Sequence, residues 1–137
     1  MSEQPVLEIS DLSISFMTRA AEIPAVTGFN CKVMPGEVVG LVGESGCGKS
    51  TIALAIMRYL GPNGKIVSGK IRFMGEDLVK MSPKQLQHIR GSQISMVYQE
   101  PSSSLNPSMM IGEQLCEVPM IHRNMNRKEA AALSIEM

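Results

Sequence analysis

Hydrophobic and polar residues alternate along the start of the chain in the manner of β-strands. Within residues 6–16 the apolar side chains fall at alternate positions, with one change of phase around Asp11: Leu7, Ile9, Leu12, Ile14 and Phe16. Such a change of phase predicts a β-bulge or a short turn at Asp11. After a loop at 18–24, residues 25–33 show a second, weaker alternation, and Pro35-Gly36 marks a turn. Two alternating stretches with a short connection favour an antiparallel pair of strands.

The pattern then changes to that of a buried strand followed by a helix. Residues 37–42 form a nearly continuous apolar run, which predicts a strand buried on both faces. Farther along, apolar residues recur with helical spacing to form one stripe: Ile52, Ala55, Ile56, Tyr59 and Leu60. Gly61 followed by Pro62 predicts the end of this helix.

The remaining elements are predicted from alternation, caps and breakers. Residues 66–74 alternate as a strand, and residues 75–77 close it. Ser82-Pro83-Lys84-Gln85 is typical of a capped helix start, and Gly91 predicts that helix's end near Arg90. The apolar run at 93–99 predicts a further core strand, and the Ser-, Pro- and Asn-rich stretch at 101–107 a loop. Helices are predicted from about 111 to 123 and again from a cap at 126–129, the last still running at Met137.

The stretch between the buried strand and the helix carries a phosphate-binding motif. It matches the pattern G-x-x-x-x-G-K-[ST], extended by one residue: Gly43, Glu44, Ser45, Gly46, Cys47, Gly48, Lys49, Ser50 and Thr51. A chance match in a chain of this length is on the order of a few in a thousand, given the average frequency of glycine. The predicted strand before it and the helix after it supply the context that this motif requires.

The residue types in this motif suit a nucleotide triphosphate. Glycines allow successive backbone N–H groups to point inward at a phosphate, and the N-terminus of the following helix adds its unsatisfied N–H groups. Lys49 is placed to reach the β- and γ-phosphates, and the Ser50 hydroxyl to hold Mg²⁺. Thr51 is placed on the side of the α-phosphate. The sequence therefore predicts a site for ATP and Mg²⁺.

Composition narrows the possible partners and surroundings. The chain has 137 residues, and its 13 Lys and Arg balance its 13 Asp and Glu, so nothing indicates nucleic acid as the main partner. No apolar run approaches the length of a membrane-spanning helix, and the first residues lack the features of a signal peptide. Cys31, Cys47 and Cys116 are widely and irregularly spaced, which favours a reduced, cytosolic setting over a disulfide framework or a zinc site.

Several segments together resemble a known family. The phosphate-binding loop, the segment Gln93-Ile94-Ser95-Met96-Val97-Tyr98-Gln99-Glu100-Pro101, and the later Ser104-Leu105-Asn106-Pro107 and Gly112-Glu113-Gln114-Leu115 are similar to ABC transporter ATP-binding subunits. The resemblance covers essentially the whole chain and is greatest to the bacterial group that energises dipeptide, oligopeptide or nickel uptake. It implies an α/β fold: a P-loop NTPase core of the ABC ATPase type with an N-terminal antiparallel β subdomain, incomplete at the C-terminus. Residues 1–137 would form a partial nucleotide-binding domain.

The resemblance also implies roles for residues outside the loop. Phe16 matches the aromatic residue that stacks on adenine, and Gln99 matches the glutamine that contacts Mg²⁺ and the attacking water. Lys49 and Gln99 would thus be the catalytic residues. Residues 100–110 would face the coupling helix of an integral-membrane permease subunit. A second ATP-binding subunit would complete the site, and a periplasmic or lipid-anchored solute-binding protein would take part indirectly.

The implied function is that of an ATPase subunit at the cytoplasmic face of the inner membrane, which drives uptake of peptides or a related small solute. The family's signature motif, the strand that ends in Asp before the catalytic Glu, and the γ-phosphate-sensing His have no match in the sequence. The 137-residue chain is therefore expected to hydrolyse ATP poorly or not at all by itself. Two alternatives remain open: a soluble P-loop or ABC-type ATPase unconnected with transport, and a truncated remnant that binds nucleotide without hydrolysing it.

Overall fold

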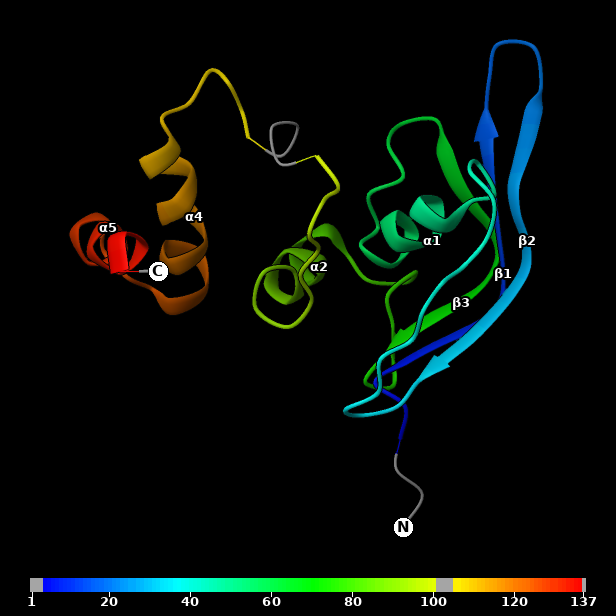
Figure 1. Ribbon diagram of the computed structural model, residues 1–137, viewed down its shortest axis with the longest axis horizontal. Coiled ribbons are helices and arrows are strands. Elements are labelled where there is room, and N and C mark those ends of the chain that lie inside the picture. The colour runs from blue at the N-terminus through cyan, green and yellow to red at the C-terminus, as the bar shows by residue number, and fades with distance from the viewer. Residues whose placement is uncertain (1–3, 101–104, 137) are drawn as a thin grey trace. The chain divides into compact units, whose positions relative to one another are not determined.

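The computed structural model describes residues 4–100 and 105–136, and Figure 1 shows their arrangement into helices and strands. The described chain divides into two compact units, one before and one after the peptide bond between Leu86 and Gln87. The first unit is built on a sheet and holds the phosphate-binding motif. The second unit is helical.

The first unit contains a four-stranded antiparallel sheet in the order β2-β1-β3-β4. Strand β1 (Leu7–Met17) is central, between β2 (Glu22–Val33) and β3 (Gly64–Phe73), and β4 (Glu76–Asp77) is a short edge strand. The predicted antiparallel pair and the predicted strand at 66–74 are confirmed. Alternation was sufficient to find them because each strand has one face toward the core and one face exposed.

The change of phase at Asp11 is a β-bulge, as predicted. Asp11 has a positive φ of 47°, and the pairing of β1 shifts register there with both neighbouring strands. The extra residue allows Ile9 and Leu12, which are three positions apart, to face the same side. Both are buried together with Ile14, Ile71 of β3 and Ile52 and Ala55 of the following helix. The core of the first unit thus lies between the sheet and that helix.

Helix α1 (Lys49–Ile56) begins in the phosphate-binding motif but ends earlier than the sequence pattern predicts. The prediction of an end at Gly61 is wrong because the chain leaves the helix at Arg58, which has a φ of 56°. The amide of Arg58 donates to the carbonyl of Ala55 and that of Tyr59 to the carbonyl of Leu54, the two hydrogen bonds of a Schellman motif. The apolar stripe predicted through Tyr59 and Leu60 therefore stops one turn short.

Residues 37–42 do not form the predicted buried strand. They have no regular secondary structure, and the side chains of Val38 and Val42 are 96% and 93% exposed. A strand that is buried on both faces needs a neighbour on each side and a layer above and below it. No described segment of this chain pairs with 37–42, so the apolar run has nothing against which to be buried.

The region around the boundary of the units is partly as predicted. Helix α2 (Pro83–Ile89) starts with the expected capping box, in which Gln85 Oε1 accepts from the Ser82 amide and Ser82 Oγ accepts from the Gln85 amide. The predicted core strand at 93–99 is wrong: beyond an isolated bridge between Arg90 and Ile94, this segment has no strand pairing in the described structure. Val97 is 95% exposed, for the same reason as the residues at 37–42.

The second unit contains the two helices predicted at the end of the chain. Helix α4 (Ile111–Arg123) has the predicted bounds, and α5 (Arg127–Glu136) begins after a capping box formed by Asn126 and Glu129. Residues 101–104 of the predicted loop lie outside the described residues. Among the described helices, none has both the length and the apolar composition needed to cross a bilayer.

Candidate phosphate-binding site

The phosphate-binding motif forms a loop that joins residues 37–42 to the first turn of α1. Gly48 is the N-cap of this helix and has a φ of 92°, a left-handed backbone conformation that residues with a Cβ rarely adopt. A Cβ at this position would also lie 2.8 Å from the carbonyl oxygen of Ala25 and 2.9 Å from Cγ2 of Val26. Glycine is therefore required here both by conformation and by the close approach of β2.

The N-terminus of α1 is open to a ligand. Its N-cap, Gly48, has no side chain to accept from the first N–H groups, and the first turn has no acidic residue. These N–H groups and the positive end of the helix dipole attract anions, and nothing in the helix itself satisfies them. This is the arrangement that binds phosphate at helix N-termini.

Lys49 is directed back into the loop. Its ammonium Nζ donates to the carbonyl oxygens of Gly43 and Glu44, at 2.7 and 2.5 Å, and lies 3.4 Å from the Cys47 sulfur. Within the described structure these contacts of the ammonium are with main-chain carbonyls and a thiol and include no carboxylate, so they do not neutralise the positive charge of Lys49. A phosphate group would supply the missing negative charge through a charge-assisted hydrogen bond.

The other motif residues differ in their accessibility. Ser50 and Cys47 are exposed, and Thr51 is half-buried. Gly43 faces Cys47 so closely that a Cβ on Gly43 would lie 2.6 Å from the sulfur. The exposed Ser50 hydroxyl directly follows the lysine, and Mg²⁺ prefers oxygen ligands while it keeps contact with phosphate oxygens. The residues present therefore fit a Mg²⁺-nucleotide at this loop.

Phe16 lies at the far end of β1 from the N-terminus. It pairs with Ile23 of β2 and Gly64 of β3, and its ring is half-buried. The ring passes so close to Gly64 that a Cβ there would be 3.0 Å from Cε1. Phe16 is thus fixed beside the turn that leads from α1 to β3, within the same unit as the phosphate-binding loop. Its stacking on adenine stays a prediction.

Gln99 belongs to the second unit and is exposed. Lys49 and Ser50 belong to the first unit. The contacts of Gln99 with Mg²⁺ and water stay predictions from the resemblance, and so does the role of the loop at 100–110 that follows it.

The motif residues beyond Gln99 contact one another within the second unit. The side-chain amide of Gln114 on α4 accepts from the Asn106 amide and donates to the carbonyls of Asn106 and Met109. Arg127 of α5 donates to Glu113 of α4 at 2.7 Å. Gln114 therefore anchors residues 106–109 to the start of α4 through their main-chain groups.

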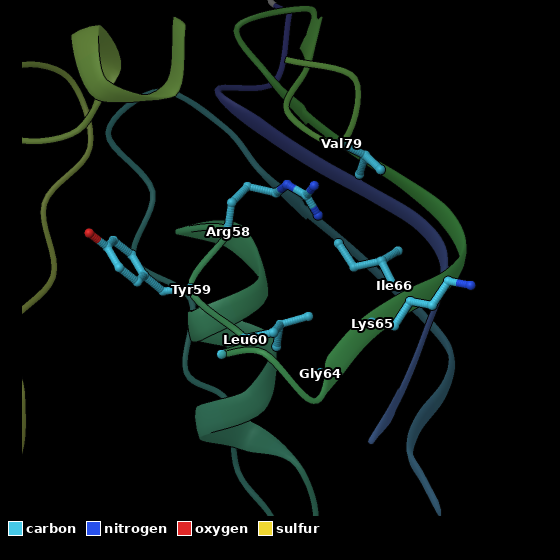
Figure 2. A pocket seen from close by; sticks show the side chains of 8 residues that line it. Arg58, Tyr59, Leu60, Gly64, Lys65, Ile66 and Val79 are labelled. Carbon is cyan, nitrogen blue, oxygen red and sulfur yellow. The ribbon is translucent and has the colours of Figure 1, made fainter. Parts of the chain in front are cut away.

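A cavity of about 450 Å³ lies at the other end of α1, and no sequence pattern predicts it. Figure 2 shows Leu60, Lys65 and Ile66 among its lining residues, with the start of β3 along one side and the end of α1 along the other. Arg58 and Tyr59 of the Schellman motif that ends α1 are among its lining residues. Helix periodicity alone gives no signal for such an early end.

Comparisons with known proteins agree with this geometry. A sequence profile described as ABC transporter matches residues 26–136. The chain is 42% identical over 132 residues to the oligopeptide transport ATP-binding protein OppD of Salmonella typhimurium, covering 96% of this chain and 39% of the relative. It is 41% identical to OppD of Bacillus subtilis, with 96% and 37% coverage, and 42% identical to AppD of the same organism, with 96% and 40% coverage.

The fold is also found in a solved structure. The ATP-binding cassette MJ0796, in a dimeric post-hydrolysis state bound to ADP and Pi, superimposes with a TM-score of 0.75 at 21% identity. The match covers 95% of this chain and 54% of that one. The fold of the described chain is therefore that of ABC-type ATPases, with the antiparallel β subdomain predicted from the sequence. The chain spans about two fifths of the length of the curated relatives it matches.

Proposed function

This chain belongs to the ABC transporter family, and from that premise we propose that it is part of the ATP-binding subunit of a peptide importer. The observation that carries the proposal is the loop at 43–51, in which Lys49 is held by main-chain carbonyls beside an uncapped helix N-terminus. Relatives named as oligopeptide transport ATP-binding proteins support peptides as the transported solute.

Each motif residue has a defined task in this proposal. The N–H groups of the loop and Lys49 bind the β- and γ-phosphates, and Thr51 contacts the α-phosphate side. Ser50 and Gln99 hold Mg²⁺, Gln99 also orients water, and Phe16 stacks on adenine. The bound Mg²⁺ neutralises charge on the phosphates during transfer of the γ-phosphoryl group. These roles rest on the family resemblance, supported by the contacts of Lys49 and the exposure of the Ser50 hydroxyl.

The proposal includes partners that the chain itself does not contain. A second ATP-binding subunit would contribute the groups needed for hydrolysis, and permease subunits would contact residues 100–110. A solute-binding protein would deliver the peptide. The subunit would lie at the cytoplasmic face of the inner membrane, and residues 1–137 would form part of its nucleotide-binding domain. That these residues form only part of the domain is supported by the match, which covers only about two fifths of the length of the curated relatives.

Uptake of a labelled tripeptide tests the transport function. Cells that produce the natural transporter with the Lys49→Ala substitution should lose nearly all uptake, because the ammonium no longer contacts the phosphates. Lys84→Ala is the matched control, because Lys84 is an exposed lysine on α2, outside the loop. Equal uptake of the tripeptide by the Lys49→Ala and Lys84→Ala cells would contradict the proposal.

Purification of the protein from the same cells distinguishes a transporter subunit from a soluble ATPase. If the subunit is part of an importer, it should co-purify with an integral-membrane partner from detergent extracts of these cells. Recovery of an active ATPase without any membrane subunit would favour the alternative of a soluble enzyme of the same family.

A further inference from the structure

The bulge at Asp11 extends across three strands of the sheet. Toward β2, residues Ser10 and Asp11 lie opposite Asn30 alone, between the pairs Ile9–Cys31 and Leu12–Phe29. Toward β3, residues Asp11 and Leu12 lie opposite Gly69 alone, between the pairs Ser10–Lys70 and Ser13–Ser68. Asp11 is thus the surplus residue in both ladders, and a bulge of this kind bends and twists the strand.

Side chains on the neighbouring strands satisfy the polar groups that the bulge exposes. The Asp11 amide donates to Asn30 Oδ1 at 2.9 Å, and Asn30 Nδ2 donates to Asp11 Oδ1 at 3.3 Å and to the Gly28 carbonyl at 2.9 Å. The Gly28 amide donates to Ser13 Oγ at 3.1 Å. Asn30 therefore replaces the ladder hydrogen bonds that are interrupted at Asp11.

The backbone at the bulge has little freedom to adopt another arrangement. Asp11 has a positive φ of 47°, which Asp tolerates better than most residues. Gly69 has a φ of 94°, and a Cβ at this position would lie 2.5 Å from the Asp11 carbonyl oxygen. The bulge thus depends on a specific residue in each of three strands, Asp11, Asn30 and Gly69, and it is the first of the register shifts along β1 toward Phe16.

The part of the β1–β2 hairpin beyond this bend contains its contact with the phosphate-binding loop and the residue expected to stack on adenine. Ala25 and Val26 of β2 lie directly against Gly48, the N-cap of α1. Phe16, the residue expected to stack on adenine, is in the same distal part of β1 and pairs with Ile23. Phe16 is on β1 and the contact with Gly48 is on β2, so a change in the twist of the hairpin at Asp11 would shift Phe16 relative to the loop that binds the phosphates.

We propose that the Asp11–Asn30 bulge is a positioning device that sets the distance between the base-binding Phe16 and the phosphate-binding loop. Asp11 and Asn30 do not contact the nucleotide in this proposal; they act through the distal hairpin. Loss of the bulge would weaken the base-dependent part of nucleotide affinity and leave the phosphate-dependent part. The inference rests on the proposed function, because it assumes that ATP binds at the loop.

The test compares the affinities of the protein for MgATP and for inorganic tripolyphosphate with magnesium, measured by calorimetry. Asn30→Ala removes three side-chain hydrogen bonds, and Asp11→Gly removes one while it keeps a residue suited to positive φ. For both variants, MgATP affinity should fall by about fivefold, the order of one aromatic stacking contact. Tripolyphosphate affinity should stay within about twofold, since the phosphate contacts are local to the loop.

Asp11→Asn is the conservative rescue, because Asn retains the acceptor oxygen and tolerates positive φ. It should show the wild-type ratio of the two affinities. A merely structural role of the bulge would lower the affinities for both ligands equally, and an unchanged ratio in Asn30→Ala and Asp11→Gly would overturn the inference. Failure of the wild-type protein to bind MgATP would instead contradict the proposed function.

Discussion

At the scale of single residues, the conformation of the loop could be anticipated because it is local. The glycines, Lys49 and Ser50 lie within nine consecutive residues, and the structure places the Lys49 ammonium at the Gly43 and Glu44 carbonyls. The requirement for glycine at position 48 has a second cause that sequence could not reveal. It comes from the close approach of β2, which is distant in the chain.

Cys47 provides a residue-scale prediction at the loop. Its thiol is exposed and lies 3.4 Å from the Lys49 ammonium, so it is accessible to reagents and lies where the phosphates would bind. Modification with a bulky maleimide should abolish ATP binding, and saturating ATP should protect the thiol. Mass spectrometry after timed labelling measures the protection. Labelling at Cys47 that proceeds at the same rate with and without ATP would contradict this placement.

Glu8 provides a pH-dependent prediction in the sheet. Hydrogen bonding and charge attraction from Lys32, supported by Arg72, hold the pKa of the Glu8 carboxyl below its ordinary value. A lowered pKa in the folded state means that the stabilisation is present above the unfolded pKa and is lost as the pH falls through the folded pKa. The wild type should therefore be more stable than Glu8→Gln at neutral pH.

The difference in unfolding free energy between the wild type and Glu8→Gln should shrink as the pH falls below about 4.3, the ordinary pKa of Glu. Urea unfolding at a series of pH values measures it. Since the ion pairs are exposed, their contribution is also expected to decrease with added salt. A difference in unfolding free energy that is constant from neutral to acidic pH would show that the Glu8 charge does not stabilise the sheet.

At the scale of elements, prediction succeeded where the signal is contained in the element itself. Strands with one exposed face show alternation of apolar and polar residues. The starts of α2 and α5 are predicted by capping boxes, and the structure contains the hydrogen bonds of both. Prediction failed for elements whose structure depends on other segments packing against them. The apolar runs at 37–42 and 93–99 have the composition of buried strands. In the described residues neither run has strand pairing beyond the bridge of Ile94 to Arg90, and Val38, Val42 and Val97 are almost fully exposed.

The cap of α5 gives a prediction at the element scale. Asn126 Oδ1 accepts from the amides of Lys128 and Glu129, and Glu129 Oε2 accepts from the Asn126 amide. Asn126→Ala should destabilise the start of α5 by about 1 kcal/mol. Hydrogen exchange of the amides in the first turn should become about fivefold faster. Lys128→Ala is the control, and equal exchange rates in the two variants would show that the cap is not stabilising.

At the scale of the whole molecule, the fold of the first unit depends on the sheet and α1 rather than on the apolar runs. Leu12 is fully buried in the sheet, whereas Val38 is 96% exposed. Leu12→Ala should therefore lower the free energy of unfolding by about 2–5 kcal/mol. Val38→Ser should change it by less than about 0.5 kcal/mol. Chemical denaturation of the 137-residue chain measures the unfolding free energies of the two variants. A large loss of stability in Val38→Ser would show that residues 37–42 are buried.

The relationship between the two units could be predicted from neither sequence pattern nor local contacts. Gln99 and the phosphate-binding loop belong to different units, so their cooperation at one Mg²⁺ is a proposal that the family resemblance supports. The position of Phe16 is better supported, since the bulge, β2 and the loop all belong to the first unit.

The central claim is that the loop at 43–51 binds nucleotide through Lys49. Isothermal titration of the protein with MgATP tests it most directly, with Lys49→Ala and the control Lys84→Ala measured alongside. We predict saturable binding of one ATP per chain by the wild type and the control. Lys49→Ala should bind roughly 10- to 100-fold more weakly, as expected for the loss of charge-assisted hydrogen bonds to phosphate. Equal affinity in Lys49→Ala, or no binding by the wild type, would contradict the assignment of this loop as a nucleotide site.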